Sequence, residues 1–161
     1  MGLFKDLLSK QKYTLYAPMN GNAVPLSEVP DPAFSGEMLG RGVAIVPTDG
    51  RVYAPCGGAV DTVFPTGHAI TLLADWGGEI LIHVGLETVA LEGKAFTLHT
   101  TQGERVEKGQ LLLEADLDGI RAAGLNPITP ILVCNWQDFA SFRVFPWDAV
   151  TLEIPVMEMK K

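Results

Sequence analysis

Two histidines, His68 and His83, are the residues of this sequence best suited to chemistry. Each lies in a largely apolar run, and the residues between the runs, Asp75, Trp76 and two glycines, are rich in turn formers. The two runs therefore predict a β-hairpin. A four-residue loop, 75–78 or 74–77, would place both imidazoles on one face of the sheet, as diagonal or direct neighbours. A loop of odd length would send them to opposite faces.

A pair of facing imidazoles suits three kinds of chemistry. The rings could be structural, each hydrogen-bonded within the sheet. They could ligate zinc, but a catalytic zinc needs three protein ligands. Asp31, Asp75 and Glu87 are candidate carboxylate ligands, but nothing in their spacing indicates that any of them binds a metal. A two-histidine half-site completed by a partner protein is also chemically reasonable. Finally, a neutral imidazole nitrogen can attack phosphorus and form a phosphoramidate, which remains a good phosphoryl donor.

If one histidine is a nucleophile, each neighbouring residue has a possible role. His83 would attack, His68 would donate to the phosphoryl oxygens, and Thr66 would support His68. Gly85 has no side chain and would let another molecule approach closely. A dry rim would slow hydrolysis and accept a partner protein. The apolar residues expected to form this rim are Phe34, Met38, Leu39, Val43, Phe64 and Ile70.

The rest of the chain favours an all-β fold. Glycines and prolines separate its short apolar runs, which cover residues 14–17, 42–47, 51–54, 59–64, the two hairpin runs, 95–100, 105–106 and 110–115. Runs of this length and spacing predict a β-sandwich or barrel. A helical turn is expected over 117–123. A faint internal repeat relates residues 17–24 to 54–60; two related half-barrels would explain it, and so would a common strand-turn-strand solution.

The length of 161 residues predicts one domain over residues 13–161, after an N-terminal segment, 1–12. That segment has apolar residues at helical spacing, typical either of an amphipathic helix on a membrane surface or of a docked or frayed terminus. No apolar run approaches membrane-spanning length and no signal peptide is visible, so we expect a cytoplasmic protein. Cys56 and Cys134 are interpreted as reduced, buried thiols.

The charge of the chain narrows the choice of partners. Its 19 acidic and 12 basic residues give a formal net charge of −7. An acidic surface repels nucleic acid and favours basic protein partners. No cluster of lysines and arginines could follow a phosphate backbone, so nucleic-acid binding is not expected. No cofactor is predicted.

The segment from Gly77 to Val89 resembles the signature of the glucose-type IIA proteins of the bacterial phosphoenolpyruvate-dependent sugar phosphotransferase system. That signature is a glycine, two variable positions, three apolar residues, histidine, an apolar residue, glycine, an apolar residue, a variable position, threonine and an apolar residue. Every position fits. Supporting matches lie throughout the chain, at residues 1–4, 29–34, 66–69, 91–96 and 129–135.

The resemblance implies an antiparallel β-sandwich or barrel of the duplicated hybrid-motif type that acts as a phosphotransferase. It implies that His83 accepts phosphate at Nε2 from the phosphorylated histidine carrier protein (HPr) and passes it to a cysteine on the IIB domain of a sugar permease. By the same match, His68 steadies the phosphoryl group and Thr66 hydrogen-bonds His68. Gly85 lies where a backbone carbonyl holds the other nitrogen of His83.

The resemblance also suggests partner contacts. Asp31 and Glu87 match acidic positions that face the basic surface of HPr, and the family usually has aspartate where Glu87 stands. Members also regulate other proteins, and zinc can bind between the two histidines and a partner's carboxylate. Two other classes remain open beside the phosphoryl relay: a zinc-dependent hydrolase that uses His68 and His83, and a regulatory binding module that never relays phosphate.

Overall fold

The computed structural model describes residues 11–161, which form thirteen β-strands and only short helical segments. The strands are β1 (Lys12–Tyr16), β2 (Gly21–Pro25), β3 (Arg41–Pro47), β4 (Arg51–Tyr53), β5 (Gly58–Val63), β6 (Ala69–Ala74), β7 (Glu79–His83), β8 (Phe96–Leu98), β9 (Arg105–Val106), β10 (Leu111–Ala115), β11 (Thr129–Val133), β12 (Ser141–Val144) and β13 (Pro155–Lys160). The helical segments are η1 (Leu26–Glu28), α2 (Pro32–Ser35), η2 (Thr88–Leu91), α3 (Leu117–Ala122) and η3 (Trp136–Asp138).

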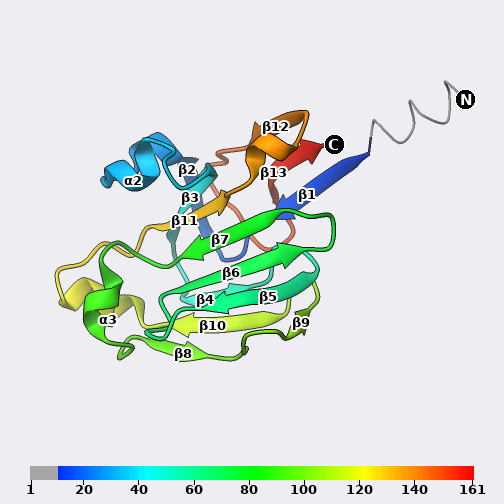
Figure 1. The fold of residues 1–161 in the computed structure, drawn as a ribbon. Coiled ribbons are helices and arrows are strands. Elements are labelled where there is room, and N and C mark those ends of the chain that lie inside the picture. Colours follow the sequence, from blue (N-terminus) through cyan, green and yellow to red (C-terminus); the bar gives the residue numbers. More distant parts are fainter. Residues whose placement is uncertain (1–10) are drawn as a thin grey trace, which may run out of the picture.

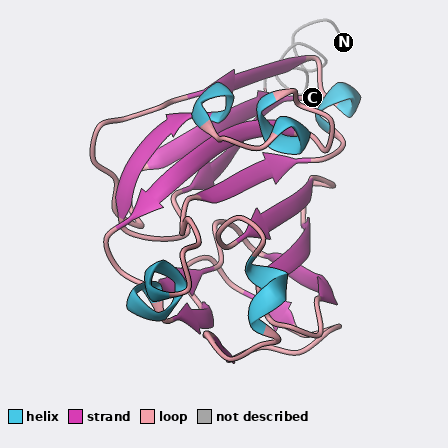
Figure 2. Cartoon of the chain, turned by 90° about the vertical axis from the view of Figure 1, so that its left-hand side faces the viewer, coloured by secondary structure: helices cyan, strands magenta, loops and turns pink. Residues whose placement is uncertain are grey.

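The strands form one large sheet and two small ones (Figures 1 and 2). The seven-stranded sheet has the order β2-β3-β11-β7-β6-β5-β9, and the small sheets have the orders β1-β13-β12 and β4-β10-β8. All paired strands are antiparallel. The predicted antiparallel β-sandwich or barrel is confirmed, and no helix within residues 11–161 is long and apolar enough to cross a membrane.

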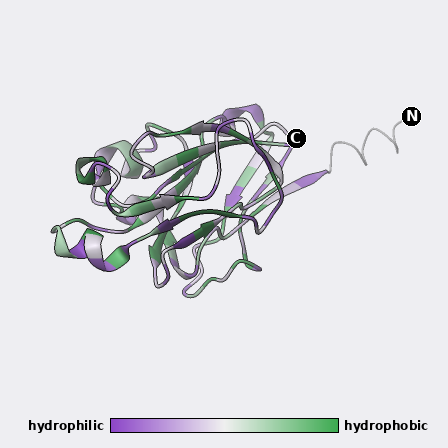
Figure 3. Ribbon diagram, turned by 90° about the horizontal axis from the view of Figure 1, so that it is seen from below, coloured by the Kyte–Doolittle hydropathy of each residue, from purple (hydrophilic) through white to green (hydrophobic). Residues whose placement is uncertain are grey.

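The main core fills the space between the large sheet and the small ones. Successive side chains of a strand point to opposite faces, so a strand can bury one face here and leave the other for a different use. Figure 3 shows hydrophilic and hydrophobic residues along the same strands. Residues of the large sheet in this core include Val43, Ile45, Ile70, Leu72, Ile80, Ile82, Ile131 and Val133; the small sheets contribute Val52, Leu112, Leu113, Met157 and Met159.

A second, smaller cluster covers the other face of the large sheet. Ala44, Ala69, Leu81 and Leu132 project from four adjacent strands and pack with residues of η1 and α2, among them Phe34. This is the face that carries His83, because His83 lies two residues after Leu81 on β7. The short segment from η1 to α2 therefore closes the sheet next to the candidate nucleophile.

Several elements were not anticipated from the sequence. The strand β11 lies in the centre of the large sheet, between β3 and β7, although proline at position 130 removes one backbone donor. The helix α2 was also missed, although Asp31 accepts a hydrogen bond from the Ala33 amide as its N-cap and a proline occupies its first turn. By contrast, the helical turn expected over 117–123 is confirmed as α3.

The two segments of the internal repeat contact one another reciprocally. The Tyr16 amide donates to the Pro55 carbonyl at 3.1 Å, and the Tyr53 amide donates to the Pro18 carbonyl at 2.7 Å. Each tyrosine starts the same tripeptide, Tyr-Ala-Pro, and the two tripeptides lead into β2 and β5. This exchange is the arrangement expected of two related halves.

The remaining expectations concern the N-terminal segment and the cysteines. Residues 1–10, most of the proposed N-terminal segment, lie outside the described residues. Cys56 is buried and Cys134 is half-buried, and both are free thiols. Burial raises the pKa of Cys56 to about 12, so its thiol stays protonated at neutral pH.

Candidate active site

The predicted hairpin is formed by β6 and β7, but its register differs from both predicted forms. Ala69 pairs with His83 and Leu73 with Glu79, and the Ala74 amide donates to the Gly78 carbonyl at 2.8 Å. The loop is therefore 75–77, three residues rather than four. Neither of the two four-residue loops considered from the sequence forms, and the expectation that an odd loop would send the two imidazoles to opposite faces was wrong.

The histidines meet because His68 lies outside the strand. The strand β6 begins at Ala69, and the preceding residue follows a turn in which Gly67 has φ +76°. Strand alternation therefore does not set the direction of the His68 side chain. The Val84 amide donates to the His68 carbonyl at 2.7 Å and holds the two chain segments together. The ring centroids of His68 and His83 lie 4.9 Å apart, with the planes at 79°.

The tautomer of His83 follows from its hydrogen bond. The Nδ1 atom of His83 lies 2.8 Å from the carbonyl oxygen of Gly85. A carbonyl can only accept, so Nδ1 carries the hydrogen, and the neutral ring keeps its lone pair on Nε2. Gly85 itself has φ +80°, which explains the glycine at this turn. Gly85 is buried, so the prediction that its missing side chain would let a partner approach closely was wrong. Its contribution to the site is the carbonyl.

Both imidazoles are held in the neutral form. Burial lowers the pKa of His83, and this effect outweighs the opposing influence of the Gly85 carbonyl and the Asp31 carboxylate. Burial, with a smaller contribution from His83, lowers the pKa of His68 to about 4. At neutral pH, Nε2 of His83 is therefore free of a proton and able to act as a nucleophile.

Thr66 contacts His68 as expected. Its hydroxyl lies 2.5 Å from Nδ1 of His68. When the hydroxyl donates this hydrogen bond, the hydrogen of the neutral His68 ring resides on Nε2, which becomes a donor. His68 is only 5% exposed, and Phe64 packs against it edge-on, with ring centroids 5.4 Å apart. His83 is the more accessible of the two histidines.

The expected apolar rim divides into three groups. Phe34 and Phe64 contact the two imidazoles directly. Met38 and Leu39 follow α2 and are 76% and 46% exposed. The other two expected residues, Val43 and Ile70, are 0% and 1% exposed and belong to the main core. Including them in the rim was wrong, because alternation along β3 and β6 turns them to the face opposite His83.

Asp31 and Glu87 line one surface depression. This cavity of about 370 Å³ is also bordered by Pro30, Pro32, Leu86 and residues 124–126. Figure 1 shows α2, α3 and the end of β7 on the same side of the molecule. The fold thus brings together two acidic residues that are 56 positions apart in the sequence, close to the His83 turn.

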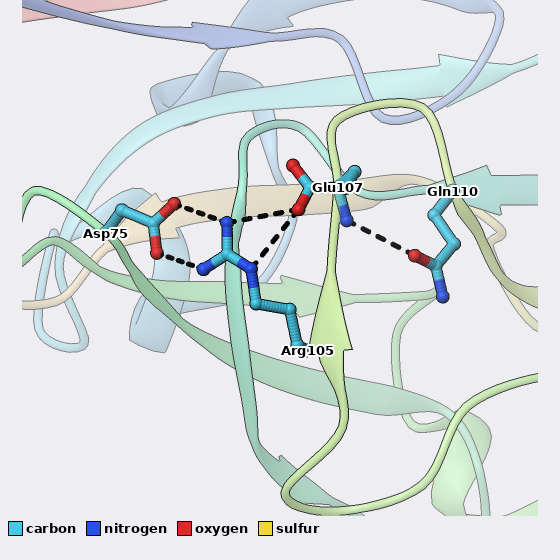
Figure 4. Close-up of polar contacts among 4 residues, drawn as sticks. All are labelled: Asp75, Arg105, Glu107 and Gln110. Carbon is cyan, nitrogen blue, oxygen red and sulfur yellow. Dashed lines mark hydrogen bonds and ion pairs between the residues drawn. The ribbon is translucent and has the colours of Figure 1, made fainter.

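Asp75, a carboxylate considered as a metal ligand, lies at the opposite end of the hairpin. It forms a two-pronged ion pair with Arg105, which also contacts Glu107 (Figure 4). Within residues 11–161, no group of three or more histidine, cysteine, aspartate or glutamate side chains could hold a metal ion. The described residues therefore do not assemble the three-ligand centre that a zinc hydrolase would need.

One residue of the site, the threonine of the signature, was given no role from the sequence. Thr88 is fully buried, and its hydroxyl donates to the Val84 carbonyl at 2.6 Å. The spacing of four residues from an apolar position to a threonine was the available signal, since a hydroxyl can reach a carbonyl four residues earlier when the chain turns. That the chain turns at Gly85 was not expected.

Comparisons with known proteins agree with this geometry. Residues 13–139 match the family described as phosphoenolpyruvate-dependent sugar phosphotransferase system, EIIA 1. The chain is 46% identical over 129 residues to the beta-glucoside-specific EIIBCA component of the phosphotransferase system from Halalkalibacterium halodurans. This match covers 80% of the chain but only 20% of that relative, so the chain spans about a fifth of its length.

A solved structure gives the same result for the fold. The glucose permease IIA from Mycoplasma capricolum is 31% identical in sequence, with a TM-score of 0.84. The match covers 92% of this chain and 96% of that one. The family model spans most of the described residues and the structural match extends over nearly the whole chain. The chain therefore belongs to the EIIA 1 family of the phosphoenolpyruvate-dependent sugar phosphotransferase system.

Proposed function

We propose that this protein is a phosphocarrier that accepts a phosphoryl group on Nε2 of His83 from phosphorylated HPr and passes it to the cysteine of a sugar-permease IIB domain. The observation that carries the proposal is the neutral His83 ring, with its hydrogen tied to the Gly85 carbonyl and His68 beside it. Family membership supports the phosphotransfer role, and the EIIBCA name of the Halalkalibacterium relative supports a IIB partner.

The transfer exchanges one phosphorus–nitrogen bond for another. The Nε2 lone pair of His83 attacks phosphorus, and the bond from phosphorus to the HPr histidine breaks, with its electron pair returning to that nitrogen. The protonated phosphohistidine of HPr becomes a neutral imidazole, and the His83 ring becomes a phosphoimidazolium that keeps its Nδ1 hydrogen. The Gly85 carbonyl stabilises this positive ring, because it accepts the Nδ1 hydrogen bond.

His68 and Thr66 act on the transferred group. With the Thr66 hydroxyl donating to Nδ1, Nε2–H of His68 points a donor toward the phosphoryl oxygens as charge redistributes over them. In the onward step, the IIB thiolate attacks phosphorus, and the electron pair of the nitrogen–phosphorus bond returns to Nε2 of His83. Neither cysteine of this chain takes this part, because Cys56 is buried with a raised pKa and Cys134 is half-buried with a raised pKa.

The charge of the proposed docking surface suits a basic protein partner. Asp31 and Glu87 supply negative charge to one depression, and the exposed Met38 and Leu39 follow α2, the helix that Asp31 caps. With a net charge of −7 over the chain, this surface favours association with a positively charged protein and speeds their encounter. Completion of a zinc site at His68 and His83 by a partner's carboxylate, and regulatory binding, would use the same surface.

The test is transfer of labelled phosphate. Incubation with enzyme I, HPr and labelled phosphoenolpyruvate should give an acid-labile, alkali-stable label on the wild-type protein. His83→Ala should abolish that label, and His68→Ala should retain it but transfer it to a IIB domain at least tenfold more slowly. His99→Ala is the matched control, since His99 is exposed and pairs with Glu114 away from the site. Labelling that persists in His83→Ala defeats the proposal.

A further inference from the structure

We propose that Thr88 is a positioning residue for His83, and that its hydroxyl secures the turn whose carbonyl selects the reactive tautomer. This inference rests on the proposed role of His83 as the phosphoryl acceptor. Thr88 does not contact phosphate in the proposal. It acts through the backbone of Val84 and Gly85.

The first step is the hydrogen bond of the hydroxyl. Thr88 is 0% exposed, and Oγ1 donates to the carbonyl of Val84 at 2.6 Å. Val84 directly follows His83 and is itself fully buried. Its amide, on the other side of the same residue, donates to the His68 carbonyl at 2.7 Å. Both polar groups of the residue after the nucleophile are thus occupied, one by Thr88 and one by His68.

The second step is the support of Gly85. Its amide donates to the Ile128 carbonyl at 3.1 Å, and the next amide, of Leu86, donates to the Asn126 carbonyl at 2.9 Å. The methyl group of Thr88 packs against the Cα atom of Gly85, so closely that a Cβ atom built on Gly85 would lie 2.5 Å from Cγ2 of Thr88. The Gly85 carbonyl is left directed at Nδ1 of His83, 2.8 Å away.

The chemical consequence concerns which ring nitrogen carries the hydrogen. While the Gly85 carbonyl accepts from Nδ1, the lone pair of His83 stays on Nε2. The Val84 carbonyl that Thr88 holds belongs to the peptide just before the one that carries the Gly85 carbonyl. If the turn loosened at Val84, the Gly85 acceptor would move away from Nδ1, and the hydrogen could exchange to Nε2. That tautomer offers no lone pair at Nε2. The hydroxyl of Thr88 therefore keeps the nucleophile in its reactive form.

Two substitutions separate the hydroxyl from the packing of the side chain. Thr88→Val preserves the shape and removes the donor, which leaves the buried Val84 carbonyl without this hydrogen bond. Thr88→Ser preserves the donor and removes the methyl group. We expect the valine variant to accept phosphate from HPr about tenfold more slowly and the serine variant to stay within about twofold of the wild type.

The decisive readout is the nitrogen NMR spectrum of His83, which reports its tautomer without any phosphoryl transfer. In Thr88→Val the two ring-nitrogen shifts should converge as the tautomers mix, and the pKa of His83 should fall, because the Gly85 hydrogen bond that raises it is weakened. Thr88→Ser should keep the wild-type shifts. Thr100→Val is the control, because it removes another buried hydroxyl, one that donates to Glu104.

Each outcome separates the two proposals. Wild-type shifts and a wild-type rate in Thr88→Val would overturn the role of Thr88 while leaving the phosphocarrier function intact. No phosphorylation of the wild-type protein would overturn the function itself, whatever the tautomer. If Thr88→Val does not fold, Thr88→Ala and Thr88→Ser carry the test: equal His83 shifts in these two variants would reject a role for the hydroxyl, and mixed tautomers in alanine alone would support it.

Discussion

The ring of Phe34 packs directly against the ring of His83, with centroids 5.1 Å apart and planes inclined at 56°. Phe34 comes from α2, is 4% exposed and belongs to the cluster that covers the outer face of the large sheet. It therefore has two effects at once: it stabilises the segment from η1 to α2 by burial, and it removes water from one side of the nucleophile.

Phe34→Ala should destabilise the protein and raise the pKa of His83. Loss of a buried phenylalanine costs about 3 to 4 kcal/mol in free energy of unfolding, including the cavity left behind. Because burial lowers the pKa of His83, admission of water should return it toward its usual value. Urea denaturation and an NMR titration of His83 measure the two effects. Phe139→Ala, in the aromatic group with Tyr13 and Trp76, should leave the titration unchanged.

The pH dependence of stability should carry the signature of the buried histidines. Folding lowers the pKa of His68 from 6.5 to about 4, so between these values the unfolded chain binds a proton that the folded protein does not. The contribution of neutral His68 to the free energy of unfolding is therefore complete above pH 6.5 and is lost as the pH falls toward 4. The loss from His68 is at most about 3 kcal/mol, and His83 adds to it in the same direction.

Urea denaturation at pH 7 and pH 5 measures this effect. His68→Gln should lose less stability than the wild type between these two pH values, because glutamine does not titrate. His99→Gln should behave like the wild type, since His99 lies on the exposed surface beside Glu114. An equal loss in the wild type and in His68→Gln would contradict the assignment.

Gly85→Ala should be far more damaging than Gly103→Ala, although both glycines have positive φ angles, of +80° and +88°. Left-handed backbone costs a residue with a side chain about 1 to 2 kcal/mol at either position. At Gly103 nothing lies within 4 Å of the new Cβ atom. At Gly85 the same atom meets Thr88 at 2.5 Å and the Asn126 carbonyl at 3.0 Å, which adds a clash of about 1 to 3 kcal/mol.

Thermal or chemical denaturation of the two alanine variants tests this difference. Only Gly85→Ala should also slow phosphate acceptance, because its carbonyl holds Nδ1 of His83. Equal stability of the two variants would show that the turn around Gly85 relaxes more readily than its contacts suggest.

Thr66→Val should impair phosphoryl transfer with little change in the pKa of His83. The valine lacks the hydroxyl that lies beside Nδ1 of His68, so the His68 tautomer is no longer selected. We expect onward transfer to a IIB domain to slow by about tenfold, comparable to the loss of one donor at a developing charge at the lower end of such effects. Thr66→Ser keeps the hydroxyl and should transfer at the wild-type rate. Measuring both acceptance from HPr and transfer to the IIB domain distinguishes a loss of the His68 donor from a loss of HPr docking.

The sequence by itself determined the class of fold and singled out the two histidines that we propose as the reactive pair. Short apolar runs broken by glycine and proline indicated an antiparallel β structure, and turn formers between two such runs indicated the β6–β7 hairpin. The chemistry of two imidazoles, with Thr66 and Gly85 close by in the chain, depended on local spacing alone. For these features, side-chain periodicity and turn preference are sufficient because neighbours in sequence stay neighbours in space.

Only the tertiary structure decided how the pair meets and what surrounds it. Strand alternation did not predict the direction of the His68 side chain, because Gly67 turns the chain before β6 begins. Val43 and Ile70 were assigned to the rim without regard to alternation, and they face the main core. Phe34 and Thr88 reach His83 through α2 and through the turn at Gly85, contacts that no period along one strand describes. Ring direction at the end of a strand is set by long-range packing and hydrogen bonds, and these exist only once the sheets have closed on one another.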